Sequence, residues 1–229
     1  MQENSGIPFE SQMEPLEWAK FIVKTKSEKN YSAAFSILSA LANKRSADAE
    51  FYLGLLYSRG QGVRKDLSTA RYWFERAADG GNLGAMYFLG KMYGKGYGAE
   101  KDAQKAIFFL STPAKMGDPR AQYELGLIFF DGNSIEKDLH SAVKWFTASA
   151  ESGHSEAQFV LGQLYKTGYG TVQSTEKALN WLTSAAVNGH RGAQILLGNM
   201  YETGDGVPVD KEEAGRWYHM SDDAVISAL

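Results

Sequence analysis

The stretch AEFYLGLLYSRGQGVRKDLSTARYWFERAADGG, from Ala49 to Gly81, decides the fold because the chain repeats its pattern. Four more copies follow at a period of 36 residues without an insertion. The glycine near the start of each copy shows the period, at Gly54, Gly90, Gly126, Gly162 and Gly198. The aromatic residue of the second half keeps the same period, at Trp73, Phe109, Trp145, Trp181 and Trp217. A fixed period of this length is typical of repeat proteins.

Each copy predicts two helices joined by a tight turn. Ala49, Leu53 and Leu56 recur at helical spacing and therefore share one face of a first helix. The Gly-x-Gly turn at residues 60–62 supplies the positive φ angles that end a helix. Asp66 then lies where a second helix needs an N-cap oxygen. One such hairpin cannot bury its apolar face alone, so the copies must stack.

Three details of the pattern carry local predictions. The glycine inside each first helix costs about 1 kcal/mol relative to alanine, so its recurrence indicates a neighbouring helix that leaves no room for a side chain. Pro113 falls inside the second helix of the second copy, and we expect that helix to be short or kinked. Gly132-Asn133-Ser134 replaces Gly-x-Gly in the third copy, which predicts a different turn there.

The repeated residues resemble the Sel-one-like repeat (SLR) family, whose units are TPR-like helix pairs. Its pattern runs Ala-x3-Leu-Gly-x2-Tyr-x2-Gly-x-Gly-Val and then Asp-x2-Lys-Ala-x2-Trp-Phe-x2-Ala-Ala-x2-Gly, and the quoted stretch matches nearly all of it. The resemblance implies an all-α fold, an α/α superhelix built as a right-handed solenoid of antiparallel helix pairs. It covers about residues 46–221.

The pattern also predicts how the chain is divided. We expect a flexible N-terminus over 1–12, a degenerate N-terminal helix pair acting as a cap over 13–45, and a C-terminal tail over 222–229. The apolar residues 224–229 would cap the last repeat or meet a second copy. Between the two ends lie the five units, at about 49–84, 85–120, 121–156, 157–192 and 193–221.

The charge, hydropathy and cysteine content of the chain limit which partners and which cellular location we expect. The 24 basic and 27 acidic residues give a net charge of −3 without a basic run, so we expect no nucleic-acid partner. No apolar stretch approaches the roughly 18 residues that a membrane span needs, and no secretory leader is visible. Cysteine is absent, which excludes disulfides, thiol nucleophiles and cysteine metal sites. A cytoplasmic location is weakly favoured, with the periplasm or secretion as the alternative for a trimmed mature form.

The sequence shows no constellation typical of catalysis. His154 and His190 occupy equivalent positions in successive turns, which favours an architectural role for both. No HExxH motif occurs, and no histidine and carboxylate residues share metal-ligand spacing. Gly94-Lys95-Gly96-Tyr97-Gly98 lacks the frame of a phosphate-binding loop and lies on the turn column of the repeat. We therefore expect no catalytic residues, no metal and no cofactor.

One column of the first helices does not fit the core. It points almost opposite to the buried face and reads Phe51, Tyr87, Tyr123, Phe159 and Ile195. In TPR-like solenoids this stripe lines the concave groove, so the resemblance implies an aromatic ladder for partner binding. The other candidate residues flank this column, at Leu55, Arg59, Lys91, Lys95, Leu127, Phe130, Asp131, Gln163, Lys166 and Asn199. The alternative is that the rings pack between adjacent first helices, and both can hold together.

Two functions from different classes remain open. The first is a non-catalytic adaptor or scaffold, a monomer or weak homo-oligomer, that binds a protein or an extended peptide in the concave groove. The resemblance implies roles of this kind in bacterial signalling, secretion and toxin immunity. The second is an enzyme or a binder of a small, cell-wall-derived ligand that uses polar groove residues.

Overall fold

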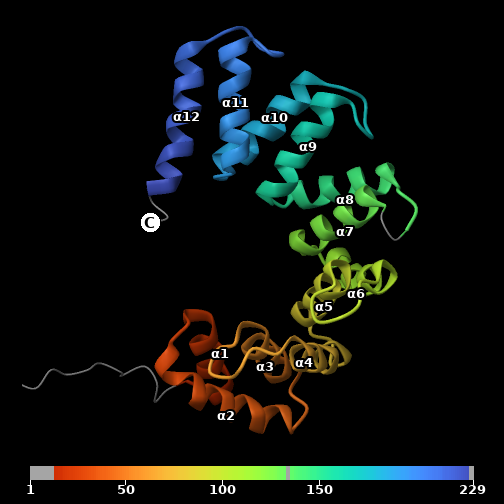
Figure 1. Ribbon diagram of the computed structural model, residues 1–229, viewed down its shortest axis with the longest axis vertical. Coiled ribbons are helices and arrows are strands. Elements are labelled where there is room, and N and C mark those ends of the chain that lie inside the picture. The colour runs from red at the N-terminus through yellow and green to blue at the C-terminus, as the bar shows by residue number, and fades with distance from the viewer. Residues whose placement is uncertain (1–12, 133–134, 227–229) are drawn as a thin grey trace, which may run out of the picture. The chain divides into compact units, whose positions relative to one another are not determined.

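The computed structural model of the protein describes residues 13–132 and 135–226, with side chains up to residue 221 (Figure 1). All regular secondary structure in these ranges is helical, apart from turns. A short 3₁₀ segment, Glu28–Asn30, precedes the second helix. The α-helices are α1 (Pro15–Thr25), α2 (Tyr31–Ala42), α3 (Ala47–Arg59), α4 (Leu67–Asp79), α5 (Leu83–Lys95), α6 (Ala103–Lys115), α7 (Pro119–Asp131), α8 (Leu139–Glu151), α9 (Ser155–Thr167), α10 (Thr175–Val187), α11 (Arg191–Thr203) and α12 (Lys211–Ile226).

The helices pack as consecutive pairs, which confirms the all-α class and the repeating helix pair. The chain forms two compact units, of which the first ends at Phe109 and the second begins at Leu110. In the first unit α3 packs on α4, and α2 and α5 flank this pair. In the second unit α7 packs on α8, α9 on α10 and α11 on α12; Figure 1 shows the last pair side by side. The helices α1 and α2 occupy the stretches of the expected cap, and they pack on each other.

A repeated set of turn contacts joins the two helices of each pair. The first glycine of the turn, such as Gly60 with φ 71°, ends the first helix in the left-handed conformation. The backbone N–H of the second helix's cap residue then bonds back to the first helix, as from Asp66 to the carbonyl of Tyr57 at 3.0 Å. The Asp66 carboxylate accepts the N–H groups of Ser68 and Thr69, which confirms the predicted cap. The same arrangement recurs at Asp102, Asp138, Ser174 and Asp210.

The glycine within the first helix lies against a large side chain of the second helix. A Cβ added to Gly54 would lie 2.5 Å from Phe74 Cε1, and one on Gly126 would lie 2.5 Å from Phe146 Cδ1. Phe74 and Phe146 are themselves fully buried, so neither ring has free space to move into. The prediction of a close approach at this glycine is therefore confirmed.

We predict that Gly126→Ala destabilises the protein, although alanine normally favours a helix over glycine. The added methyl group overpacks the contact with Phe146, which we expect to lower the free energy of unfolding by about 2 kcal/mol. Gly215→Ala is the matched control, because no atom lies within 4 Å of a Cβ at that helical position. Urea unfolding followed by circular dichroism should show a lower midpoint for the first variant and an equal or higher midpoint for the second. Equal midpoints for Gly126→Ala and the wild type would contradict the close approach.

In four of the five repeats, a buried polar side chain of the first helix links it to the preceding second helix, whereas the second repeat has Met86 at this position. In three repeats it is a glutamine whose amide donates to a backbone carbonyl at 3.0–3.1 Å, in the pairs Gln122–Ala114, Gln158–Ala150 and Gln194–Ala186. The first repeat has Glu50 instead, which is buried and cannot donate in its charged form. Arg76 replaces the missing donor: its guanidinium bonds to the Ala42 carbonyl at 3.3 Å and pairs with Glu50 at 2.6 Å.

We predict that Arg76→Ala leaves the Glu50 carboxylate buried without its cation and lowers the free energy of unfolding by about 2 kcal/mol. Adding Glu50→Gln should recover most of this loss, because a glutamine there can donate to the Ala42 carbonyl as in the later repeats. Chemical unfolding of both single variants and the double variant measures the coupling. Additive effects of the two substitutions would contradict this account.

Two sequence predictions concern the second and third repeats. The helix α6 keeps the 13 residues of its counterparts although it contains Pro113, so the expected shortening is wrong. Pro113 lies in the last turn and lacks only one N–H, and the helix then ends at the usual place. Asn133 and Ser134 lie outside the described residues, as do residues 227–229 and the side chains of residues 222–226. The predicted different turn, the role of the apolar tail and the domain boundaries stay predictions.

Candidate functional site

The aromatic column lies on helices α3, α5, α7 and α9, and its members Phe51, Tyr123 and Phe159 pack against the start of the next first helix. In the first unit, the ring centroid of Phe51 lies 6.0 Å from that of Phe88 and 5.9 Å from that of Phe74. A Cβ added to Gly84, in the first turn of α5, would lie 3.0 Å from the Phe51 ring. Phe51 is thus half-buried between α3 and α5, and Tyr87 is only 8% exposed.

In the second unit the column stacks on histidines. The Tyr123 ring lies 4.9 Å from the His154 imidazole with an interplanar angle of 28°. The Phe159 ring lies 4.2 Å from the His190 imidazole at 23°. One face of each half-buried ring is therefore covered by the neighbouring repeat. Ile195, in the last repeat, is 37% exposed.

The two histidines hold these rings because they also cap helices. His154 Nδ1 accepts the backbone N–H of Ala157 at 3.3 Å, and His190 Nδ1 accepts that of Ala193 at 3.1 Å. His190 Nε2 lies 3.1 Å from a carboxylate oxygen of Glu156 in the preceding repeat. Burial lowers the pKa of His154, against the opposing attraction of nearby carboxylates such as Glu156. Burial likewise raises the pKa of Tyr123.

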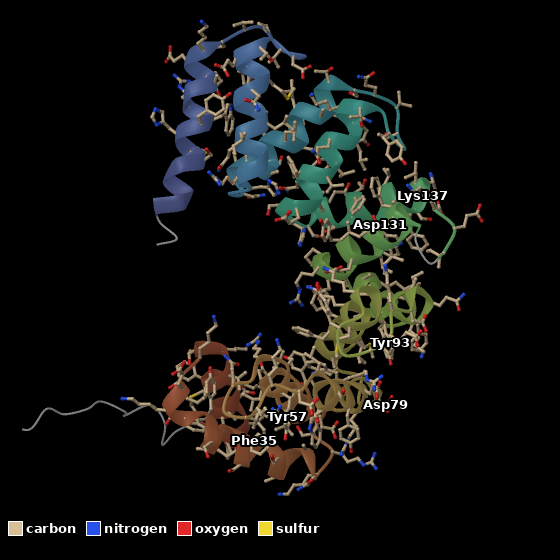
Figure 2. All side chains as sticks on the ribbon, viewed as in Figure 1. Phe35, Tyr57, Asp79, Tyr93, Asp131 and Lys137 are labelled. Carbon is tan, nitrogen blue, oxygen red and sulfur yellow. The ribbon has the colours of Figure 1, made fainter. Side chains whose placement is uncertain are left out.

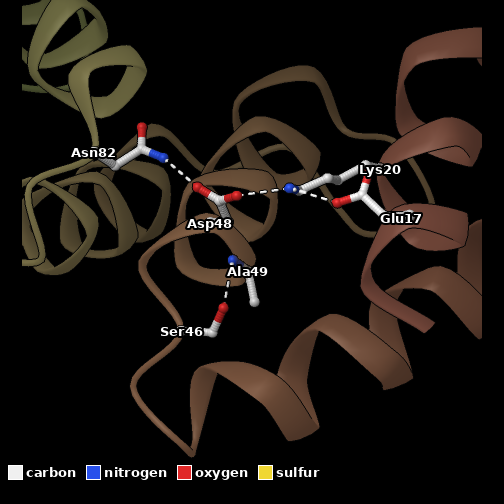
Figure 3. A network of polar contacts seen from close by, with 6 residues as sticks. All are labelled: Glu17, Lys20, Ser46, Asp48, Ala49 and Asn82. Atoms are coloured by element: carbon white, nitrogen blue, oxygen red, sulfur yellow. Dashed lines mark hydrogen bonds and ion pairs between the residues drawn. The ribbon is translucent and has the colours of Figure 1, made fainter. Parts of the chain in front are cut away.

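The same cap position links repeats in the first unit (Figure 3). Asn82 caps α5 and donates to Asp48 of α3 at 2.9 Å. Asp48 also accepts Lys20 of α1 at 2.6 Å, and Lys20 bonds to Glu17 at 2.9 Å. The cap residues of α5, α9 and α11 therefore contact the preceding repeat, through an asparagine in the first unit and through histidines in the second.

The flanking candidates differ in how far they reach solvent. Leu55 is 6% exposed, which leaves little of it for a partner. The side chains of Lys91, Leu127, Phe130 and Lys166 are half-buried. Lys91 Nζ lies 5.5 Å from the Tyr87 ring centroid, and Lys166 pairs with Asp205 at 2.7 Å. The exposed candidates on these flanks are Arg59, Lys95, Asp131, Gln163 and Asn199.

One further contact on this side of the second unit joins two turns. Lys137 Nζ bonds to the Tyr169 hydroxyl at 3.3 Å and lies 5.7 Å from the Phe130 ring centroid. Figure 2 labels Lys137 and Asp131, which lie near the ends of the turn after α7. The Phe130 ring meets that of Tyr169 edge to face at 5.7 Å. This cluster holds Phe130 in place, so the candidate is partly a structural residue.

A metal-binding cluster is absent from the described side chains, those of residues 13–132 and 135–221. Within these ranges, no group of three or more histidine or acidic residues could hold a metal ion. None of the described helices is long and apolar enough to cross a membrane. The side chains of the first helices instead offer rings, amides and charges, which suit non-covalent contact with another molecule.

The fold and this face define an α/α-repeat protein of 36-residue helix pairs. The Sel1 repeat family model matches residues 47–82, 84–118, 119–154, 155–190 and 192–221. The chain therefore belongs to the Sel1 repeat family.

Solved structures give the same result. A Sel1 repeat protein from Oxalobacter formigenes is 33% identical with a TM-score of 0.84, over 95% of this chain and 91% of that one. A protective antigen of uropathogenic Escherichia coli with an SLR fold is 34% identical with a TM-score of 0.78, over 83% of this chain and 41% of that one. An immunity protein from Pseudomonas aeruginosa is 22% identical with a TM-score of 0.54, over 84% and 74% respectively. A search of curated proteins found no match.

We predict that the stability of the second unit depends on the protonation of His154. A protonated imidazole cannot accept the Ala157 N–H, and burial already favours the neutral form in the folded state. The unfolded chain therefore binds the proton more readily, so this contribution is present above about pH 6.5 and is lost as the pH falls below that value. His154→Asn should reduce the decline in unfolding midpoint between pH 7.5 and pH 5, because asparagine caps without titrating, as Asn82 does in α5.

The exposed His140 provides the control for this measurement. His140→Asn should leave the difference between the two pH values as it is in the wild type. An unchanged pH dependence in His154→Asn would show that the cap does not sense pH.

Proposed function

We propose that the protein is a non-catalytic adaptor that binds another protein or an extended peptide on its first-helix face. This face comprises the aromatic column and the exposed residues beside it. The observation that carries the proposal is the stacking of Tyr123 and Phe159 on the cap histidines. Each ring is held in one orientation and remains half-buried, so a partner would meet a preorganised surface.

The polar residues beside the rings support selective contact. Gln163 and Asn199 are exposed at successive repeats of one column, and Asp131 and the half-buried Lys166 add charges of opposite sign. Aromatic anchors supply most of the binding energy in such interfaces, and surrounding polar groups set orientation and partner choice. Membership of the Sel1 repeat family is consistent with this class of function.

Toxin immunity is included in this proposal because of the fold. The P. aeruginosa immunity protein has a similar fold at 22% identity, so a helical repeat of this kind serves an immunity protein. If this chain is an immunity protein, we expect the partner that it binds to be a toxin. Cells producing that toxin should survive when they also make the wild-type chain, and die when they make a variant that does not bind it.

We predict that two added charges on the first-helix face abolish partner binding without unfolding the chain. The double variant Gln163→Arg with Ile195→Arg changes residues that reach solvent on α9 and α11. Exposed substitutions of this kind change stability by less than about 0.5 kcal/mol. Affinity capture from the source cells, read by mass spectrometry, compares this bait with the wild type.

The matched control adds the same two charges to the exposed surface of the second helix α10. Asn180→Arg with Thr183→Arg should retain each partner that the wild type retains. A partner held equally by both double variants would place binding elsewhere and contradict the proposal.

A further inference from the structure

A second feature of the first unit lies on helix α4 and involves an arginine in an apolar column. The column faces the first helix of the next repeat and has apolar residues at the equivalent positions, Phe35, Ile107, Val143 and Leu179. Phe35 shows what the position does, because its ring meets that of Tyr57 edge to face at 6.0 Å. Arg71 occupies this position beside Tyr93, the counterpart of Tyr57, and Figure 2 labels both tyrosines.

The Arg71 side chain is 36% exposed, and its guanidinium is only partly paired by the surrounding residues. Its Nε is buried and has no hydrogen-bond partner. Arg71 Nε lies 3.9 Å from Glu75 Oε1, an oxygen that already accepts the Tyr93 hydroxyl at 3.1 Å. A buried donor without a partner costs free energy that an apolar residue would avoid. The core therefore gives no reason for an arginine here.

Arg71 lines a pocket of about 410 Å³, a volume in the range of small-molecule sites. Tyr93, Glu100, Lys101, Asp102 and Lys105 complete its lining. The Tyr93 ring forms a rigid wall, because the Phe109 ring stacks on it at 5.8 Å and 5°. Lys105 Nζ lies 5.2 Å from the centroid of the same ring.

The acidic residues around the pocket are largely engaged with groups of the protein. Asp102 caps α6 by accepting the Lys105 N–H at 2.9 Å, and its second oxygen lies 3.7 Å from Lys105 Nζ. Glu75 holds Tyr93, and Glu100 is exposed to water. Lys101 is also exposed and can turn its ammonium group to a ligand.

We propose that this pocket binds the oxyanion of a small ligand, a carboxylate or a phosphate. Arg71 donates from its guanidinium, and Lys101 and Lys105 add positive charge around the anion. Guanidinium groups suit such oxyanions because their planar donors match two oxygens at once. This site is separate from the first-helix face, and its test does not depend on the function proposed above.

The fourth repeat provides a natural comparison. Lys177 Nζ lies 5.2 Å from the Tyr165 ring centroid, the same distance as between Lys105 and Tyr93. At the positions equivalent to Arg71 and Lys101, two repeats further along, the chain has Val143 of the third repeat and Gln173 of the fourth. The lysine and tyrosine are thus shared by both repeats, whereas the arginine and the second lysine are particular to the proposed site.

The test is a titration of the full chain with inorganic phosphate and, separately, with acetate, at constant ionic strength. Amide signals of residues 71 and 100–105 in a ¹⁵N–¹H correlation spectrum should shift saturably with at least one anion, and comparison of the two identifies the preferred oxyanion. Arg71→Leu should weaken that binding by at least about tenfold, since it removes the charged donor. Its thermal midpoint should equal or exceed that of the wild type, because leucine suits the column. Lys177→Gln should change neither result.

Two further variants make the outcome decisive. Lys101→Gln alters an exposed residue, so it should fold normally and weaken binding even if Arg71→Leu does not fold. Val143→Arg with Gln173→Lys should create a second saturable site in the fourth repeat. Absence of saturable shifts with both anions would overturn the proposal, as would binding that Arg71→Leu and Lys101→Gln leave unchanged. A lower midpoint for Arg71→Leu with unchanged binding would show that Arg71 is structural.

Discussion

Within each helix pair, the second helix approaches the first so closely that a glycine must lie at the crossing. Phe74 against Gly54 and Phe146 against Gly126 show the same contact in the two units. A large buried ring in contact with backbone fixes the distance between the two helices and excludes other packings. This distance also sets the positions of the turn between the helices, the cap of the second helix and the alanines that face each other. The whole repeat therefore depends on glycine at the crossing.

The second recurring feature is the cap residue of the first helix, which in α5, α9 and α11 also contacts the preceding repeat. Asn82 bonds to Asp48, and His190 meets both Glu156 and the Phe159 ring. The residue that accepts an unpaired N–H at the start of a helix thus also contacts the preceding repeat. Capping of the helix is therefore coupled to stacking of the repeats. For the same reason the aromatic column is a structural feature and a surface at once: its rings are held by the scaffold that a partner would have to recognise.

Much of the fold could be predicted because the residues that specify the helices and turns act locally and recur in every repeat. Glycine at residue 60, aspartate at residue 66 and alanine at residue 49 each act within a few residues of themselves, and the structure shows the expected turn, cap and buried face. The shortening expected at Pro113 is wrong because the proline falls in a last turn that ends at the usual place. The candidate face was predictable as a column, whereas the burial of Leu55 and Tyr87 depends on neighbouring elements that no single column reveals.

The repeat, its period, the helix ends and the family resemblance can be read from the order of residues, since they follow from backbone conformation and from spacing along one helix. The tertiary structure alone decided which rings are covered, that two histidines support the column, and that the Arg71 Nε lies buried without a partner. Contacts between residues some 30 positions apart set these outcomes. Whether a buried donor finds an acceptor depends on where neighbouring atoms lie in three dimensions, and the order of residues does not specify that position.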